Sequence, residues 1–194
     1  VTPLPSSGGS YVLQVVATDV IGRSATYNVP FEITVPLGVV VDGANQDPAS
    51  GWYDGSVDLT VTGTGSLSYA VGSGSPVGLV DGETFTVTGN GPVPVAVTDG
   101  STTQNFAFNI DGDGAPVFTE GLPATGGSYA FDAGAVYAFG CTDVSLVSCD
   151  VSVGGAPVLA GDALPAAPGS YTLDVVAVDS VGNTTILSIP FDIT

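Results

Sequence analysis

The sequence predicts an all-β chain made of β-sandwich modules in tandem. Apolar and polar residues alternate with a period of two in short segments, and Gly, Asn or Asp separate these segments about every eight to twelve residues. A period of two places alternate side chains on one face of a strand. No segment keeps the period of about 3.6 that a helix requires, so we expect helix content close to nil.

The strand segments can be followed along the chain. Two expected strands, 171–178 and 188–193, are separated by a turn at 179–183, and two others cover 57–62 and 84–88. The residues expected on the inward faces are Val57, Leu59, Val61, Phe85, Val87, Tyr171, Leu173, Val175, Ala177, Ile189, Phe191 and Ile193. Pro30, Pro94 and Pro190 interrupt such segments. Because proline cannot donate to a strand ladder, we expect these strands to be sheet edges or to carry bulges.

An internal duplication defines the modules. Residues 1–34 align without gaps with residues 161–194 at an offset of 160, and 15 positions are identical. The tripeptide Gly-Ser-Tyr, for example, occurs at 9–11 and at 169–171. A weaker copy of the same pattern covers 93–110, about 80 residues before the last one.

The copies predict a module of about 80 residues, with boundaries where Pro and Gly gather near 35–38 and 112–116. The expected domains are a partial module at 1–36 that contains only the last two strands, a module at 37–113, and a module at 114–194 that contains both cysteines.

The composition excludes several classes of function. The chain has 194 residues, of which 19 are Asp or Glu, one (Arg23) is Lys or Arg and none is His, so its formal net charge is −18. Without His or Lys there is no imidazole base, His metal ligand or Schiff-base lysine. The negative charge opposes binding to nucleic acid and to anionic membranes, and no apolar run is long enough to span a bilayer. We therefore expect no enzyme, no nucleic-acid partner and no membrane insertion.

The run from Gly169 to Asn183 resembles the last hairpin of bacterial immunoglobulin-like (Ig-like) repeat modules of secreted and surface proteins, whose pattern is G-x-Y-x-x-x-V-x-A-x-D-x-x-G-N. Residues 9–22 fit the same pattern, with Arg23 where Asn is expected. The segments 50–61 and 141–149 are similar to an early strand and to a two-cysteine variant of such modules. The resemblance implies tandem Ig-like β-sandwiches, and a tyrosine corner in which the hydroxyl of Tyr11 or Tyr171 binds upstream backbone.

Cys141 and Cys149 are the only cysteines of the chain. With no third cysteine and no His they cannot complete a zinc site. Two interpretations stay open, a disulfide and a pair of buried free thiols, and the short spacing favours the disulfide. A disulfide indicates an oxidising compartment, so we expect an extracellular or cell-surface location.

The segment 111–114, Asp-Gly-Asp-Gly, is the best candidate for a metal site. Carboxylate and carbonyl oxygens from Asp111 and Asp113 could surround Ca²⁺, the one cofactor that the sequence leaves open. The resemblance allows such a site, because Ca²⁺ often stiffens arrays of this kind. The alternative is a plain turn, since Asp and Gly tolerate its dihedral angles. The segment also lacks the spacing of an EF-hand.

Two further groups of residues have a structural and a functional interpretation. Asp19, Asp99 and Asp179 recur at the hairpin turn of each copy, which favours side-chain bonds within an Asx turn over a ligand site. Trp52 and Tyr53, next to Asp54, could form a stacking platform for a glycan. A Trp in a small module is more often part of the core.

The sequence thus predicts a non-enzymatic structural repeat of an extracellular stalk, adhesin extender or fibre, whose partners are tandem modules or further copies of the same protein. Residues 1–34 supply only two strands, and an isolated hairpin is marginally stable. Either preceding sequence or a neighbouring chain completes this module, and the second option describes a filament subunit. The alternative function is a carbohydrate-binding or accessory module of a secreted polysaccharide-degrading enzyme.

Overall fold

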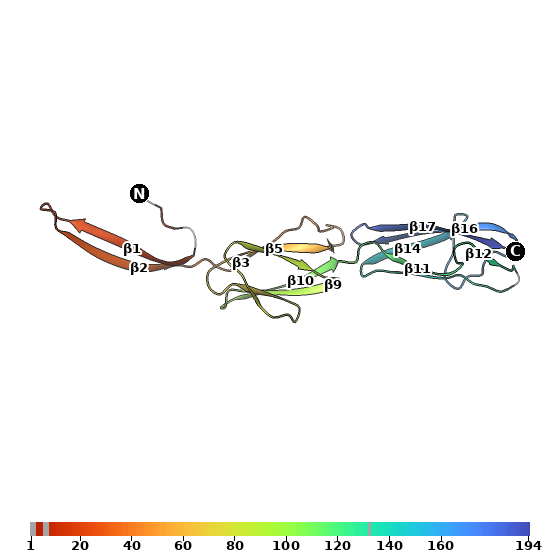
Figure 1. Ribbon diagram of the computed structural model, residues 1–194, viewed down its shortest axis with the longest axis horizontal. Helices are drawn as coiled ribbons and strands as arrows, with labels where there is room; N and C mark the ends of the chain where they lie inside the picture. The colour runs from red at the N-terminus through yellow and green to blue at the C-terminus, as the bar shows by residue number, and fades with distance from the viewer. Residues whose placement is uncertain (1–2, 6–7, 132) are drawn as a thin grey trace. The chain divides into compact units, whose positions relative to one another are not determined.

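The computed structural model describes residues 3–5, 8–131 and 133–194, which form strands, turns and loops without a helix (Figure 1). The all-β prediction is confirmed. No helix of the described part of the chain could therefore cross a membrane. The chain divides into two compact units: Val1–Asp42, Asp58–Val87 and Pro94–Ala107 form unit 1, and Gly43–Val57, Thr88–Val93 and Phe108–Thr194 form unit 2. The predicted domain boundaries at 36/37 and 113/114 stay predictions.

The N-terminal hairpin consists of β1 (Gly9–Thr18) and β2 (Ser24–Ile33), which pair with each other alone (Figure 1, red). Its register runs from Gly9 opposite Ile33 to Thr18 opposite Ser24. The C-terminal strands β16 (Gly169–Asp179) and β17 (Thr184–Ile193) pair in the same register, with Gly169 opposite Ile193. The duplication seen in the sequence therefore extends to every backbone pair of the hairpin.

Two sheets form the sandwich between residues 38 and 111. One has the order β3-β5-β8 and the other the order β4-β10-β9-β6-β7. The strands are β3 (Gly38–Val41), β4 (Tyr53–Asp54), β5 (Ser56–Thr62), β6 (Ser68–Val71), β7 (Val77–Gly78), β8 (Glu83–Thr88), β9 (Gly91–Thr98) and β10 (Thr103–Asp111). The sheets face each other, because the ring of Tyr69 on β6 stacks on the ring of Phe85 on β8 with centroids 3.8 Å apart.

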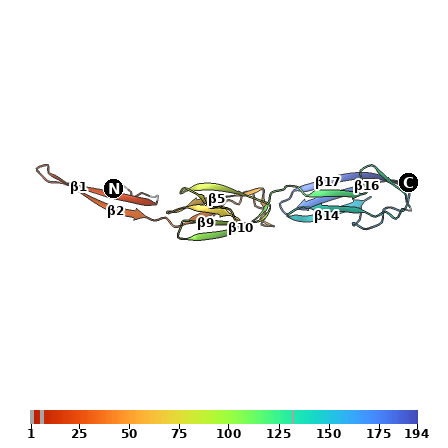
Figure 2. The same cartoon turned by 60° about the horizontal axis from the view of Figure 1, so that its bottom comes forward.

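The last sandwich repeats this arrangement within unit 2. Its sheets have the orders β11-β13 and β12-β17-β16-β14-β15, and Figure 2 shows β14, β16 and β17 side by side. The remaining strands are β11 (Val117–Leu122), β12 (Gly127–Tyr129), β13 (Ala138–Thr142), β14 (Leu146–Val153) and β15 (Ala156–Pro157). In both five-stranded sheets a short first strand pairs in parallel with the last long strand. The two sheets share one topology, that of the Ig-like sandwich, and the predicted fold class is confirmed.

The inward residues predicted from the alternation form the cores. The buried side chains include Val57, Leu59, Val61, Phe85, Val87, Leu173, Val175, Ala177, Ile189, Phe191 and Ile193. In unit 2 Tyr137, Val151 and Leu164 complete the cluster from the other strands and loops. Burial of each large apolar side chain stabilises the fold by roughly 1.5–3 kcal/mol, so the apolar faces hold the two sheets together.

The expectation that the prolines mark sheet edges is confirmed for one strand and wrong for the other two. Pro30 lies on β2, which has no second neighbour among the described strands. In contrast, β9 and β17, which contain Pro94 and Pro190, are interior strands. The short strand β6 pairs only with residues 95–98 of β9, and the short strand β12 pairs only with residues 191–193 of β17. Each proline therefore lies one residue beyond the paired stretch. The missing N–H group therefore leaves no ladder bond unmade.

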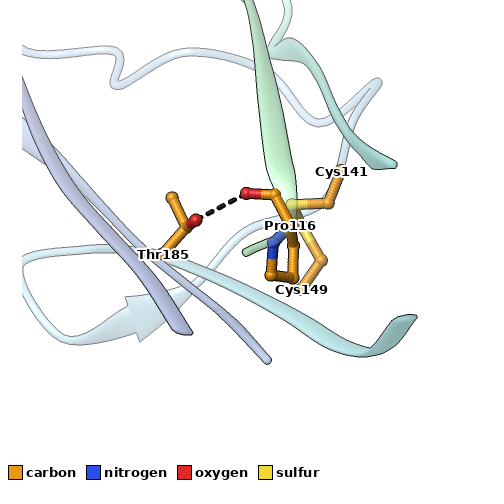
Figure 3. Close-up of a disulfide and its surroundings, with 4 residues drawn as sticks. All are labelled: Pro116, Cys141, Cys149 and Thr185. Atoms are coloured by element: carbon orange, nitrogen blue, oxygen red, sulfur yellow. Dashed lines mark hydrogen bonds between the residues drawn. A yellow bond between two sulfur atoms is a disulfide. The ribbon is translucent and has the colours of Figure 1, made fainter. Parts of the chain in front are cut away.

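Cys141 on β13 and Cys149 on β14 form a disulfide, with Cα atoms 6.0 Å apart (Figure 3). The prediction of a disulfide is confirmed, and the interpretation as free thiols is wrong. Because β13 and β14 belong to different sheets, the bridge links the two layers of the last sandwich. Pro116, which is fully buried, lies beside the bridge, and its carbonyl accepts a hydrogen bond from the Thr185 hydroxyl.

The hairpin turns have the predicted Asx bonds. Oδ1 of Asp179 accepts hydrogen bonds from the N–H groups two and four residues on, and Oδ1 of Asp19 does the same. Oδ1 of Asp99 accepts from the N–H groups two and three residues on. The pKa values of Asp19 and Asp99 are lowered, chiefly by the backbone N–H groups of Arg23 and Thr102 respectively. The recurrence of these residues is thus explained by turn structure.

Tyr171 forms the predicted tyrosine corner, because its hydroxyl donates to the carbonyl of Ala167 at 3.0 Å. We expect Tyr171→Phe to lower the free energy of unfolding by about 0.5–1.5 kcal/mol, since the ring stays packed on Phe191 while one hydrogen bond is lost. Urea unfolding followed by circular dichroism measures this change. Tyr27→Phe, at an exposed ring, serves as the control and should have no effect. Equal effects of the two substitutions would contradict the role of the corner.

Candidate functional site

Three carboxylates from two distant segments of the sequence meet in unit 2. Asp111 ends β10, Asp113 follows it by two residues, and Asp143 lies in the turn between β13 and β14. One carboxylate oxygen of each lies within 4.8 Å of those of the other two. Asp111 is buried, Asp143 is half-buried and Asp113 is exposed, so the cluster is open to solvent on one side. We name Asp111, Asp113 and Asp143 the acidic cluster.

Ser145 holds two members of the acidic cluster in place. Its hydroxyl donates to Oδ2 of Asp111 at 2.5 Å, and its N–H donates to Oδ1 of Asp143 at 2.8 Å. Its own carbonyl accepts hydrogen bonds from the N–H and the hydroxyl of Ser180, next to the turn residue Asp179. Ser145 is buried, and its bonds draw two negatively charged side chains together rather than apart.

The electrostatics of the acidic cluster are unfavourable in the folded chain. Burial raises the pKa of Asp111 above its ordinary value, and the Asp113 carboxyl and the charges of Asp143 and Asp179 raise it further. The hydrogen bond from the Ser145 hydroxyl lowers the same pKa and offsets only part of this rise. The Asn90 side chain is the main cause that lowers the pKa of Asp113. Because the pKa of Asp111 is higher in the folded than in the unfolded state, the free energy of unfolding falls as the pH rises through the interval between the two values. Ionised Asp111 thus costs stability at neutral pH.

The glycines of the segment 111–114 have backbone reasons for their positions. A Cβ atom on Gly112 would lie 2.1 Å from the carbonyl oxygen of Gly89, and Gly114 has a φ of 78°. These two features agree with the interpretation as a turn. They do not explain the carboxylates, because Asp111 takes no part in an Asx bond to its own turn and instead accepts from Ser145, 34 residues away.

A second candidate site is the apolar face of the N-terminal hairpin, formed by Tyr11, Leu13, Val15, Ala17, Tyr27, Val29, Phe31 and Ile33, which we name the hairpin face. Leu13 is 53% exposed and Val15 is 47% exposed, whereas their counterparts Leu173 and Val175 are 1% and 0% exposed. Tyr11 stacks on Phe31 with centroids 5.6 Å apart, the same separation as between Tyr171 and Phe191. The face therefore has the geometry of a core layer without the opposing layer among the described residues.

The residues predicted to contact a glycan lie in different environments. Tyr53 is buried and packs edge-on against Phe108 with ring centroids 5.6 Å apart. Trp52 is half-buried in the loop before β4. As a result only Trp52 could offer part of a ring face to a sugar. The glycan contact stays a prediction.

The segment 111–114 indicates two members of the acidic cluster, but no sequence motif indicates the residues that complete it. Asp143, Ser145 and Asn90 are separated from Asp111 by about 20 to 34 residues and form no motif with it. One feature of the sequence could have indicated Asp143. It lies between the two cysteines, in a short segment that joins two strands and therefore contains a turn.

Comparisons with known proteins found weak likenesses of fold. No family model and no curated protein sequence matches the chain. Among solved structures, it is similar to fibronectin(III)-like modules of Clostridium thermocellum CbhA at 12% identity and a TM-score of 0.33, covering 81% of this chain and 94% of that one. A titin Ig tandem has 12% identity and a TM-score of 0.39, covering 72% and 87%. The N-terminal four Ig domains of Dscam1 have 13% identity and a TM-score of 0.46, covering 94% and 54%.

Proposed function

We propose that the chain is a non-enzymatic structural segment of an extracellular tandem array of bacterial Ig-like modules, used as a stalk, adhesin extender or fibre. In this proposal the N-terminal hairpin receives the missing strands of its sandwich from a neighbouring chain, which makes the protein a filament subunit. The observation that carries the proposal is the exposed hairpin face, because most of its duplicate in unit 2 is buried: Leu173, Val175, Ala177, Ile189, Phe191 and Ile193 belong to the core, and Leu187 alone is exposed.

The C-terminal sandwich indicates what must cover the hairpin face. There β14 pairs antiparallel with β16, β12 pairs in parallel with β17, and Tyr137, Val151 and Leu164 pack onto the face from other strands and loops. By the same register, the partner would place one strand antiparallel to β1 and a short strand parallel to β2. This arrangement is strand addition to an open sheet, in which backbone hydrogen bonds supply affinity and apolar side chains supply register.

The neighbouring strands that this hairpin needs are engaged elsewhere in the chain itself. The strands β3 to β10 and β11 to β17 fill the two sandwiches described above. The completing strands therefore have to come from residues outside 1–194, and we assign them to a neighbouring chain. Their inward residues should be apolar, because the hairpin face carries no charged side chain.

The disulfide and the composition support the rest of the proposal. The bond between Cys141 and Cys149 is typical of an oxidising compartment, as expected for an extracellular protein. The chain has no His and no Lys, and the nucleophile–base pairs and Schiff bases of common enzymes depend on these residues. Packed sandwiches with short connections suit a mechanical role.

Electron microscopy of the native material tests the proposal. We expect regular fibres with a constant subunit repeat, and we expect the substitution Leu13→Asp to abolish them because it places a charge in the completed core. Val16→Asp is the matched control, since Val16 lies on the opposite face of the same hairpin and its counterpart Val176 stays 39% exposed. Single particles without fibres would overturn completion by a neighbouring chain. The proposal of a tandem array would then be tested by a structure of a longer polypeptide that contains this segment.

A further inference from the structure

We propose that Asp111, Asp113 and Asp143 together bind one hard divalent cation, with Ca²⁺ as the ion that the chemistry favours. This inference does not depend on the proposed filament. All three residues belong to unit 2, together with Ser145, which binds Asp111 and Asp143, and Asn90, which accepts from the N–H of Gly112 between Asp111 and Asp113. The cation would turn the charge repulsion of the acidic cluster into a link between the end of β10 and the turn before β14.

An unsatisfied buried oxygen points to a missing ligand. Asp111 is 1% exposed, yet its Oδ1 has no hydrogen-bond partner, while its Oδ2 accepts from Ser145. The unsatisfied oxygen belongs to the carboxylate whose neighbours in the cluster are the oxygens of Asp113 and Asp143. A buried, ionised carboxylate is costly unless it is paired or coordinates a metal.

No side chain of the protein can supply the missing positive charge. Arg23 is the only Lys or Arg residue, and its Nε already pairs with Asp19 at 2.7 Å. Neutralisation must therefore come from solution, either as a cation or as a proton.

The chemistry of the cluster favours Ca²⁺ among the common cations. The side chains offer only oxygen, and the two cysteines are joined in the disulfide, so the soft and imidazole ligands that select transition metals are absent among the described residues. Ca²⁺ binds oxygens at about 2.3–2.6 Å, which places two ligands on opposite sides of the ion up to about 5 Å apart. The limit of 4.8 Å between the cluster oxygens fits this span. Ca²⁺ also accepts irregular geometry, whereas Mg²⁺ demands a near-ideal octahedron.

The surrounding hydrogen bonds organise the cluster before an ion arrives. Ser145 holds Asp111 and Asp143 at the same time, and Asn90 Oδ1 accepts a hydrogen bond from the N–H of Gly112. Outer contacts of this kind fix the orientation of metal ligands.

The rival explanation is a proton shared between Asp111 and Asp113. It predicts a chain whose stability at pH 7 does not respond to divalent cations. The cation site predicts one bound Ca²⁺ per chain in titration calorimetry, and a melting temperature that rises by about 3–5 °C for each tenfold excess of Ca²⁺ over Kd, relative to the same protein in chelator. No heat of binding and no change of melting temperature at 10 mM CaCl₂ would overturn the proposal.

Substitutions localise the site. Asp111→Asn and Asp143→Asn should each abolish the Ca²⁺-dependent shift, and Asp113→Asn, at an exposed position where the fold is not at risk, should weaken binding at least tenfold. Asp150→Asn is the matched control, because it removes one exposed carboxylate of the same unit outside the cluster and should leave the shift intact. A shift that survives all three cluster substitutions would overturn the assignment. A response to Mg²⁺ stronger than that to Ca²⁺ would overturn the identity of the ion.

Discussion

Leu173→Ala should lower the free energy of unfolding of the C-terminal sandwich by about 2–5 kcal/mol, whereas Leu13→Ala should cost less than about 0.5 kcal/mol. The two leucines occupy the same place in the duplicated hairpin, opposite Ile189 and Val29 respectively. Leu173 is 1% exposed and contributes to the core of unit 2, so truncation removes buried methyl groups and leaves a cavity. Leu13 is 53% exposed, so truncation changes little.

Urea unfolding of the isolated chain, followed by hydrogen exchange at the amides of β16 and β1, measures the two effects separately. Exchange is needed because two compact units need not unfold in one step. Each substitution is the control of the other, since residue type, strand position and register are identical. Equal losses for the two would mean that the hairpin face is covered in the isolated chain.

The same pair tests the filament. In the assembled native material the hairpin face should be buried, so the cost of Leu13→Ala should rise toward that of Leu173→Ala. If instead Leu13→Ala remains without effect in assembled fibres, completion of the hairpin cannot be what joins the subunits.

The duplicated hairpin also explains how far the sequence could predict the fold. Alternation over 171–193 is a local property, and it correctly predicted which side chains of β16 and β17 face the core. The exposure of Leu13 and Val15 has no local signal, because the same alternation produces either outcome. The exposure of these side chains depends on whether other strands cover the face. Those strands come from residues distant in the sequence or from another molecule.

The acidic cluster and the prolines show the same limit. Asp111 and Asp113 are two residues apart and form a pair that the sequence alone indicates, but Asp143 joins them only because β10 ends beside the turn that precedes β14. The rule that places the prolines of β9 and β17 at sheet edges or bulges assumes that neighbouring strands have equal lengths. In this fold β6 and β12 are short, and an interior strand can carry proline beyond their ends.

Replacing Cys141 and Cys149 by Ser should lower the free energy of unfolding of unit 2 by about 2–3 kcal/mol, the loop-closure value for a bridge of this span. The bond joins residues 8 positions apart, on strands that belong to different sheets. The sheet β11-β13 has only two strands, so it relies on packing and on this bridge to stay against the larger sheet. Phe118 and Phe139, with ring centroids 6.0 Å apart, lie on these two strands and pack against the core.

Hydrogen exchange locates the effect, because amides of β11 and β13 should lose more protection than those of β16 and β17. Dithiothreitol should destabilise the wild-type chain to the same extent and leave the double variant unchanged, which separates loss of the bridge from an effect of the new serines. The β1–β2 hairpin belongs to unit 1, so its exchange should not respond to either treatment and provides an internal control. Uniform loss of protection throughout the chain would contradict this expectation. It would show that the two units unfold together and that the disulfide stabilises the whole chain, not only the C-terminal sandwich.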